Sequence, residues 1–476
     1  MTPRRYEMVV GLEVHVQLKT RTKAFCRCAT TFGDPPNRNT CPVCLALPGA
    51  LPVLNAEAVA LALRAVLALG CTVHERSEFA RKNYFYPDLP KGYQISQFDR
   101  PLAERGRVEL PGDGAIGITR VHMEEDAGKL VHDRFAGVTA VDLNRSGVPL
   151  IEIVSEPGIR SATEAGAYLR ALREILRYAD VSDCSMEEGS LRVDANVSAR
   201  PHGEPALRTR TEIKNLNSFS NVERALELEF ARHCAVYDAG GAIVQQTMLF
   251  DAARGAVRPA RSKEESHDYR YFPEPDVPPL VLARAEIDRV RAALPELPAA
   301  RRSRYVSALR VTAADAQVLA ASRAVGDYFE AVAAAAGDAQ AAAHWVTGEL
   351  LASLNATGGD VTATPVRAER LGALIALVAR GAVSNTAAKT IFATMHRDAA
   401  DPAAIAARDG LLQVGDDDAL RAWIDEVWAE HPEEAARFAA GERRLQGVLV
   451  GHVMRKSGGR ADPRKVNQLL AGRSGT

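Results

Sequence analysis

The sequence predicts an α+β protein in which a strand-rich first part is followed by helices. Residues 1–290 contain short runs of alternating apolar and polar side chains, typical of strands with one buried face. The proline-rich segment PEPDVPPL, which starts at Pro273, cannot form a regular helix or a central strand. After Pro298, alanine is frequent and apolar residues recur at helical spacing. We expect a strand-rich cradle over residues 1–294, a helical domain over 295–402 and a helical tail over 403–476.

The clearest strand is Tyr6–Leu18, where two kinds of residue alternate. One face carries Val10, Leu12, Val14 and Val16, and the other carries Gly11, Glu13, His15 and Gln17. Three strand pairs follow: Val108–Leu110 with Ile116–Met123, Ala140–Leu143 with Pro149–Val154, and Leu191–Ser198 with Arg208–Ile213. Helices are expected at about 54–69, 161–179 and 219–236. The second opens with Ser161 and Glu164, at the spacing of a capping box.

The composition excludes several classes of protein. With 47% hydrophobic and 25% charged residues among 476, the chain is an ordinary globular protein rather than a disordered or fibrous one. The net charge of −1 excludes a general basic field for nucleic acid, so any RNA contact must be local. No apolar stretch is long enough to span a membrane. Glu7, Glu13 and His15 interrupt any signal-peptide core, so we expect a cytoplasmic protein.

Four of the seven cysteines lie close together, as Cys26-x-Cys28 and Cys41-x-x-Cys44. Each pair can present two thiolates from a tight turn, and four thiolates complete the tetrahedral coordination of zinc. Such a closed site would be structural. A redox pair or plain buried thiols are the alternatives.

Two nucleotide-binding patterns can be set aside. Gly112, Gly114 and Gly117 match the spelling of a dinucleotide-binding loop, but a strand rather than a helix follows them, which indicates a hairpin. The sequence contains no P-loop, so any ATP must be bound in another way.

Charged and amide side chains recur on the predicted strands. Glu13 and His15 share a face, and His122, Glu124 and Asp126 alternate with Met123 and Glu125. Further along the chain come Glu152, Asp194, Asn196, Glu212 and Lys214. Oxygen ligands for a hard cation, with a nearby lysine for phosphate, are what a magnesium–phosphate site requires. Each residue alone is also explained by an exposed strand face.

Two further features are compatible with nucleic acid. The segments RKNYFYPD, from Arg81, and SHDYRYFP, from Ser266, pair cations with aromatic rings that can stack on bases or form a small aromatic core. The last 25 residues carry Arg455, Lys456, Arg460, Arg464, Lys465 and Arg473 against Asp462, a net charge of +5. Clustered cations of this kind can bind phosphates or form a solvated helix end.

Long motifs in this chain resemble one family over essentially its whole length. They are GLEVHVQL from Gly11, the two cysteine pairs, RKNYFYPDLPKGYQISQ from Arg81, MEEDAGK from Met123, DLNRSGVPLIEIVSEP from Asp142, SLRVDANVS from Ser190, EIKNLNSF from Glu212, SHDYRYFPEPD from Ser266 and GHVMRKSGGRADPRKVNQLL from Gly451. The family that these motifs resemble is the GatB family of aspartyl/glutamyl-tRNA(Asn/Gln) amidotransferase subunits. Its tail is shared with YqeY-like proteins.

The resemblance implies a glutamine-hydrolysing ligase reaction. The cradle would use ATP and Mg²⁺ to phosphorylate the side-chain carboxylate of Glu on tRNA(Gln) or of Asp on tRNA(Asn). Ammonia would then displace phosphate to give Gln-tRNA or Asn-tRNA. A separate amidase subunit would supply the ammonia, and a small third subunit would clasp both in a heterotrimer. This chain lacks an amidase signature of its own.

The resemblance also assigns roles to residues. It implies Mg²⁺ ligands at Glu13, His15 and Glu125, a lysine lining the ammonia channel at Lys82, and structural zinc on the four cysteines. Less specifically, it implies catalytic, magnesium or nucleotide contacts at Glu152, Asp194, Asn196, Glu212 and Lys214. The tail would bind tRNA through Arg455, Lys456, Arg460, Arg464 and Lys465.

Three questions stay open at this point. Adjacent residues of a strand face opposite sides, so Glu124 and Glu125 cannot both line one site without a bulge. A catalytically silent tRNA-binding scaffold with a structural zinc is the alternative function, although a scaffold has no reason to gather hard-metal ligands. The sequence does not distinguish Asp-tRNA from Glu-tRNA as the substrate.

Overall fold

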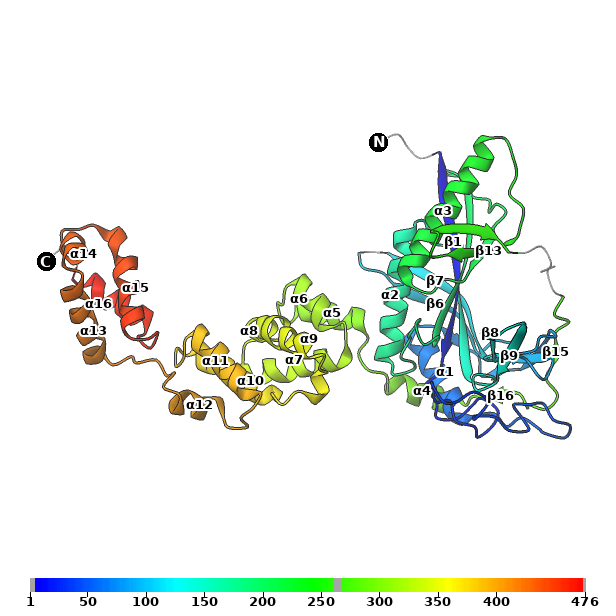
Figure 1. Ribbon diagram of the computed structural model, residues 1–476, viewed down its shortest axis with the longest axis horizontal. Helices are drawn as coiled ribbons and strands as arrows, with labels where there is room; N and C mark the ends of the chain where they lie inside the picture. The colour runs from blue at the N-terminus through cyan, green and yellow to red at the C-terminus, as the bar shows by residue number, and fades with distance from the viewer. Residues whose placement is uncertain (1–4, 113, 261–267, 474–476) are drawn as a thin grey trace. The chain divides into compact units, whose positions relative to one another are not determined.

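The computed structural model describes residues 5–112, 114–260 and 268–473. The chain forms two compact units, Met1–Leu297 and Pro298–Thr476. The first unit contains all the named strands, and the second is built from helices and their connections (Figure 1). The predicted α+β class is therefore confirmed.

A nine-stranded sheet forms the centre of the first unit, in the order β14-β13-β12-β11-β1-β10-β7-β6-β2. Neighbouring strands are antiparallel except β12 and β13. The bounds are β1 Tyr6–Gln17, β2 Thr72–Val73, β6 Ala103–Glu109, β7 Ala115–Glu125, β10 Pro149–Ser155, β11 Leu191–Pro201, β12 Thr211–Lys214, β13 Thr247–Asp251 and β14 Ala256–Pro259.

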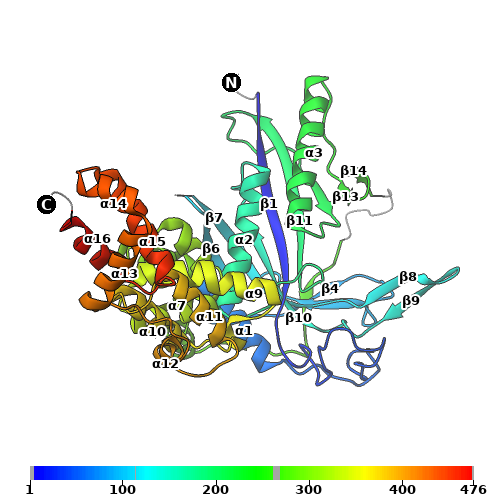
Figure 2. The ribbon, with the colours of Figure 1, turned by 60° about the vertical axis from the view of Figure 1, so that its left-hand side comes forward.

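The alternation predicted for β1 is confirmed. Val10, Leu12, Val14 and Val16 are fully buried, whereas Glu13 and His15 on the opposite face are only partly buried. The apolar face belongs to one core that also contains residues of three helices, α1 Ala56–Ala68, α2 Ala162–Tyr178 and α3 Phe219–Asp238. Helix α3 packs along β11 and against α2 (Figure 2). The polar face of the sheet is therefore left for a site.

The three helices begin close to their expected positions because polar side chains cap them. The Asn55 side chain accepts hydrogen bonds from the backbone N–H groups of Glu57 and Ala58. Ser161 accepts one from Glu164, which confirms the predicted start of α2. Such caps satisfy backbone donors that the first turn of a helix leaves unpaired.

Three small sheets surround the central one, in the orders β15-β4-β5, β16-β3 and β8-β9. Their bounds are β3 Arg76–Ser77, β4 Ala80–Asn83, β5 Tyr93–Ser96, β8 Lys129–Phe135, β9 Val138–Asp142, β15 Phe272–Pro273 and β16 Leu280–Val281. Helix α4, Arg284–Ala292, packs beside α1. Ser266 and His267 of the second aromatic segment lie outside the described residues.

One predicted strand pairing is wrong. The expected pairing of Ala140–Leu143 with Pro149–Val154 does not form, because β9 pairs with β8, and β10 lies between β1 and β7. The reason is burial: six of the seven residues of β10 are buried, which requires neighbours on both edges and cover on both faces. The other two predicted pairs, β6 with β7 and β11 with β12, are confirmed, and residue 113 of the first turn lies outside the described residues.

The second unit contains two separate apolar clusters. One includes Tyr305, Phe329, Leu371 and Ile405, and the other runs from Leu420 to Leu470. The α-helices are α5 Pro298–Ser307, α6 Ala313–Leu319, α7 Arg323–Ala336, α8 Ala339–Trp345, α9 Leu351–Thr357, α10 Ala368–Ala379, α11 Asn385–Met395, α12 Pro402–Arg408, α13 Asp417–Glu430, α14 Pro432–Ala439, α15 Gln446–Lys456 and α16 Pro463–Ala471. A π-helix, Val346–Leu350, joins α8 to α9, and short 3₁₀ turns lie at Val361–Ala363 and Arg443–Leu445.

Helix α12 packs with the middle helices α10 and α11, through the buried Ile405 and Ala406. The tail cluster begins only in α13. We therefore move the expected tail boundary from 402/403 to the segment between α12 and α13. Among the described residues, no helix is long and apolar enough to cross a membrane.

Candidate active site on the polar face of the central sheet

Most of the residues that the sequence singled out lie on one face of five adjacent strands, β12, β11, β1, β10 and β7; Glu125 and Lys82 are the exceptions. Strand register makes this possible. His15 lies opposite Arg192 on one side and Glu152 on the other, and Glu152 lies opposite His122. One row of polar side chains therefore crosses four strands that are far apart in the sequence.

The first cluster combines His15 and His122 with two buried carboxylates. His15 Nε2 lies 3.2 Å from Glu152 Oε2 and 3.9 Å from Glu124 Oε2. His122 Nε2 lies 3.1 Å from Glu124 Oε1 and 3.4 Å from Glu152 Oε2. One ligand atom from each of His15, Glu124 and Glu152 falls within 4.8 Å of the other two, so the three could hold a metal ion.

Local charges control the ionisation of this cluster. Burial by itself raises the pKa of Glu124, but the hydrogen bond with His122 and the charges of His122 and Lys82 together outweigh burial and lower that pKa to about 2. Burial by itself lowers the pKa of His122, but hydrogen bonds with Glu124 and Glu152 raise it to about 9. The pKa of His15 is also raised, against burial, by its hydrogen bond to Glu152. Without a metal, protons on the imidazoles supply the positive charge that these carboxylates need, and a cation can replace that charge.

The second cluster lies beside the first, on β1, β11 and β12. Asn196 donates a hydrogen bond of 3.0 Å to Glu13 Oε1, and Asp194 lies directly opposite Glu13 in the sheet. Burial, then the nearby charges of Glu152 and Glu212, raises the pKa of Glu13. Burial likewise raises the pKa of Asp194, although Lys214 opposes it. These carboxylates are close enough to repel one another, so a cation placed among them is favoured.

Glu125 does not belong to either cluster, which corrects its predicted place beside Glu13 and His15. It points to the opposite face of β7 from Glu124, as the pleat of a strand requires. Its carboxylate pairs with Lys91 and accepts a 3.0 Å hydrogen bond from the backbone of Ile95. Glu124 occupies the position beside His15 in its place.

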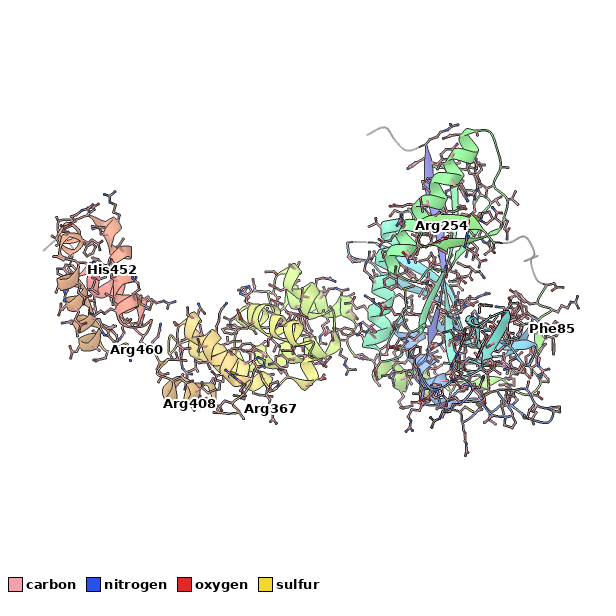
Figure 3. The ribbon with its side chains drawn as sticks, in the orientation of Figure 1. Phe85, Arg254, Arg367, Arg408, His452 and Arg460 are labelled. Atoms are coloured by element: carbon pink, nitrogen blue, oxygen red, sulfur yellow. The ribbon has the colours of Figure 1, made fainter. Side chains whose placement is uncertain are left out.

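Lys82 approaches the first cluster from β4. Its pKa is raised because the charges of Glu124, Tyr271 and Glu152 outweigh the effect of burial. The ammonium lies 5.0 Å from the centre of the Tyr269 ring. Tyr271 stacks on Phe98 with ring centres 4.1 Å apart, so aromatic side chains border the polar face at this end. Phe85, nearby in the sequence, is 90% exposed (Figure 3).

A cavity of about 530 Å³ opens beside the second cluster. Gly11, Glu13 and Asn196 line its floor, and Arg208 and Arg210 line its wall. Arg210 donates a 3.0 Å hydrogen bond to the Asn196 side chain. Gly11 leaves room here: a Cβ atom on it would meet nothing closer than 3.9 Å.

The four cysteines converge in a lobe between β1 and α1. Cys44 Sγ lies 3.5 Å from Cys26 Sγ, 3.7 Å from Cys41 Sγ and 3.8 Å from Cys28 Sγ. These separations match the edge of a tetrahedron with metal–sulfur bonds of ~2.3 Å, which is ~3.8 Å. Hydrogen bonding from Cys26, assisted by the charge of Lys23, lowers the pKa of Cys44 to about 4. The cluster can therefore bind a metal.

The basic residues of the tail are exposed, but several already have acidic partners. Lys456 pairs with Glu426 and Glu430 of α13, and Lys465 Nζ lies 3.7 Å from Asp417. Residues 411–476 contain ten Lys and Arg against ten Asp and Glu, a net charge of zero. The positive charge of the last 25 residues is therefore offset by acidic residues that precede them, mostly on α13 and α14. Of the five residues predicted to contact tRNA, Arg455, Arg460 and Arg464 are exposed and have no carboxylate partner among the described residues; Arg460 is labelled in Figure 3.

A third group of possible ligands lies in the tail, at His431, Glu434 and His452. Arg455 donates a 2.6 Å hydrogen bond to His452 Nδ1, and His452 Nε2 lies 3.0 Å from Glu434 Oε2. Arginine has no acceptor, so Nδ1 must accept and the proton of the ring lies on Nε2. That arrangement leaves no lone pair for a metal, and we interpret the group as an ion-pair network.

Sequence reasoning underestimated some residues of this face. The alternating pattern around Met123 did not assign a role to His122, although His122 contacts both carboxylates of the first cluster. Arg208 and Arg210 fall in a predicted strand, but they precede β12 and line the cavity. The alternation of His122 with Met123 was the available sequence signal that His122 faces the site. No local sequence signal existed for Arg208 and Arg210.

Comparisons with known proteins identify the family of this chain. Residues 8–288 match the model of the GatB/GatE catalytic domain family, and residues 327–473 match the GatB domain. The chain is 51% identical over 473 residues to a Carboxydothermus hydrogenoformans protein named as an aspartyl/glutamyl-tRNA(Asn/Gln) amidotransferase subunit, covering 98% of each chain. A Geobacter sulfurreducens protein of the same name is 52% identical over 471 residues, again covering 98% of each chain. This chain therefore belongs to the GatB/GatE catalytic domain family, as the sequence motifs predicted.

Proposed function

We propose that this chain is the subunit of a tRNA-dependent amidotransferase that activates and amidates the side chain of Glu on tRNA(Gln), of Asp on tRNA(Asn), or of both. The two clusters of carboxylates on one sheet face, beside a cavity lined by two arginines, are the observation that carries the proposal. In the first step a carboxylate oxygen attacks the γ-phosphorus of ATP and ADP leaves. In the second step ammonia attacks the acyl carbon and phosphate leaves.

The chain offers two places for a divalent cation. His15, Glu124 and Glu152 suit one, because their ligand atoms lie within 4.8 Å of one another. Glu13, Asp194 and Glu212 suit a second, because the charges of Glu212 and Asp194 act on Glu13 and a cation among them would offset their repulsion. Magnesium bound there would neutralise the charge that develops on the transferred phosphoryl group. His122, buried behind Glu124 and Glu152, holds both carboxylates in place through its Nε2 contacts.

The cavity beside Glu13 suits ATP. Its volume of about 530 Å³ is in the usual range for sites that bind small molecules. Arg208 and Arg210 can contact phosphate oxygens, for which the guanidinium group is well shaped. The γ-phosphate would then point along the sheet face toward Glu13 and the first cluster.

Lys82 and the aromatic residues suit the other substrate. The charges of Glu124 and Glu152 act on Lys82, and its ammonium lies 5.0 Å from the centre of the Tyr269 ring, so a carboxylate bound beside Lys82 would lie close to the first cluster. The family resemblance assigns Lys82 to the ammonia channel. Ammonia arriving at this end would reach the acyl carbon without crossing bulk solvent, where it is mostly protonated.

Two partner proteins and a structural metal would complete the enzyme. An amidase partner would release ammonia from glutamine, and a small third subunit would hold the two together. The four-cysteine lobe would hold a structural zinc. The protein would act in the cytoplasm, where tRNAs are charged.

The test is a reconstituted complex with its amidase and small partner subunits. Glu13→Gln and His15→Ala should each abolish conversion of Glu-tRNA(Gln) and Asp-tRNA(Asn), while glutaminase activity of the complex survives. Glu7→Gln is the matched control, because Glu7 lies on the same face of β1 but pairs with Arg200 away from both clusters. Conversion at the unmodified rate by either site variant would contradict the assignment. A complex without tRNA-stimulated ATP hydrolysis would favour the scaffold alternative.

A further inference from the structure

Lys23 is completely buried beside the four cysteines. Its side chain is 0% exposed, and its ammonium donors are directed into the protein. Nζ lies 2.7 Å from the carbonyl oxygen of Asn39, 3.1 Å from that of Leu143 and 3.4 Å from Cys44 Sγ. A lysine with no solvent contact is rare and needs a reason.

The ordinary reason is a carboxylate partner, and Lys23 has none among the described residues. Its contacts are two neutral carbonyl groups and one sulfur. Neutral carbonyls satisfy the hydrogen bonds of an ammonium but do not balance its charge. Burying an unbalanced charge is strongly unfavourable. A negative charge must therefore lie close by, and Cys44 is the one group of these three that can carry it.

A metal centre supplies more negative charge than a single thiolate. Four thiolates carry −4, and a divalent cation leaves −2 on the centre. Sulfur ligands of such centres commonly accept N–H hydrogen bonds from neighbouring groups, which reduce the charge they donate to the metal. The Lys23 ammonium donates such a hydrogen bond to Cys44 Sγ.

We propose that Lys23 is the charge-compensating partner of a divalent metal held by Cys26, Cys28, Cys41 and Cys44, through its N–H···S contact with Cys44. This inference rests on the zinc site in the proposed function. Lys23 is a positioning residue, since it acts on the metal through Cys44. The tetrathiolate centre and the ammonium stabilise each other, and each is unfavourable when buried alone.

Lys23 also connects the cysteine lobe to the site. Its Nζ holds the carbonyl of Leu143, and the backbone N–H of Ala24 donates to the carbonyl of Gly147. Gly147 has a φ of +85°, and a Cβ there would lie 3.5 Å from Lys23 Cδ. The Leu143–Gly147 segment leads into β10, which carries Glu152. Loss of the metal should therefore loosen the segment that precedes β10.

The first test replaces Lys23 by methionine, which keeps the apolar stem and removes the charge. Lys19→Met is the matched control, because Lys19 lies four residues away, is partly exposed and pairs with Asp180. We expect Lys23→Met to bind zinc about 10- to 100-fold more weakly than the unmodified chain in competition with a chelator. In Co²⁺-loaded protein, its sulfur-to-metal charge-transfer band should move to lower energy, since Cys44 becomes a stronger donor. Lys19→Met should change neither quantity.

The outcomes separate the two proposals. An unmodified chain that binds no zinc overturns both the zinc site and the role of Lys23. Zinc bound normally by the unmodified chain and equally well by Lys23→Met, with the same Co²⁺ spectrum, overturns the role of Lys23 alone.

A second measurement needs no substitution and covers the case in which Lys23→Met does not fold. The unmodified chain is treated with an amine-labelling reagent in its zinc-loaded form and after removal of zinc. The peptide that contains Lys23 should be labelled only after the metal is removed, whereas Lys19 should be labelled in both forms. Labelling of Lys23 that does not depend on zinc overturns the proposal.

Discussion

At the residue scale, the pleat of one strand decides which of two neighbouring glutamates belongs to the site. Glu124 shares the face of His122, and its carboxylate lies 3.9 Å from His15. Glu125 lies on the other face, where Lys91 and the Ile95 backbone hold it. The two glutamates of the motif MEEDAGK therefore have different surroundings, and replacing one by glutamine should not have the same effect as replacing the other.

We expect Glu124→Gln to lower tRNA-stimulated ATP hydrolysis by about 100-fold or more, since it removes a charged ligand from the proposed cation site. Glu125→Gln should leave that hydrolysis within a few-fold of normal, because its carboxylate does not face the clusters. ATP hydrolysis by the reconstituted complex, with and without misacylated tRNA, measures both. Equal losses in the two variants would contradict the separation of the faces.

Gly11 offers a test of the cavity beside Glu13. A Cβ at this position meets no atom closer than 3.9 Å, so Gly11→Val should fold normally while its side chain occupies the cavity. We expect the KM for ATP to rise by about tenfold or more, corresponding to a loss of ~1.4 kcal/mol of binding. Ser198→Ala, which slightly enlarges the same cavity, is the control. An unchanged KM for Gly11→Val would mean that ATP binds elsewhere.

At the element scale, a buried carboxylate on helix α3 holds that helix against strand β12 of the central sheet. Glu229 and His233 of α3 are fully buried, and Thr211 of β12 donates a 2.8 Å hydrogen bond to Glu229 Oε1. Arg232 donates to both carboxylate oxygens of Glu229. The contact lies outside the polar face, so it can be altered without touching the clusters.

This contact should make the first unit sensitive to acid. Burial alone would raise the pKa of Glu229, but hydrogen bonds from His233, Arg232 and Thr211 lower it from 4.5 to about 2. A lowered pKa means that the folded state binds fewer protons. The contribution is therefore fully present above pH ~4.5 and is lost as pH falls toward 2.

Between pH 4.5 and 2, the free energy of unfolding should fall by up to about 3 kcal/mol less in Glu229→Gln than in the unmodified chain. Chemical denaturation at a series of pH values measures it. Glu227→Gln, also on α3, is the control. A variant whose stability falls with acid as steeply as that of the unmodified chain would show that Glu229 titrates normally.

At the scale of the whole molecule, the tail has no net charge, but only some of its basic residues have carboxylate partners. Acidic residues of α13 already neutralise Lys456 and Lys465, whereas Arg455, Arg460 and Arg464 have no carboxylate partner among the described residues. Phosphate contacts should therefore depend on the three arginines rather than on the whole basic set. Removing the tail should begin after Gly415, because α12 belongs to the preceding cluster.

We expect the variant with Arg455, Arg460 and Arg464 all replaced by Gln to bind tRNA more weakly. Three lost phosphate contacts should reduce the slope of log affinity against log salt by about 2 to 3 units. Lys456→Gln, which removes a cation already paired with Glu426, should change the slope little. Binding of tRNA by the complex across a salt series measures both. An unchanged slope in the triple variant would place the RNA contacts elsewhere.

Much of this molecule could be predicted from local sequence. Alternation of side chains predicted both faces of β1, the Ser161 capping box predicted the start of α2, and the spacing of the cysteine pairs predicted the four-sulfur cluster. Besides the boundary of the tail, two outcomes departed from prediction. Ala140–Leu143 has the pattern of a partner for β10 but pairs with β8, and Glu125, predicted beside His15, lies on the opposite face.

The sequence by itself determined the fold class, the family and the kinds of residue that gather in the site. Those features depend on local backbone periodicity and on spacings within short segments, which can be read along one chain. Only the tertiary structure decided that His122 joins His15 and Glu152, that Arg208 and Arg210 line the cavity, and that α13 pairs with the basic tail. These contacts join strands and helices far apart in the sequence. Their register is set by the packing of the whole core, because a local pattern defines which face a side chain occupies but not which strand lies beside it.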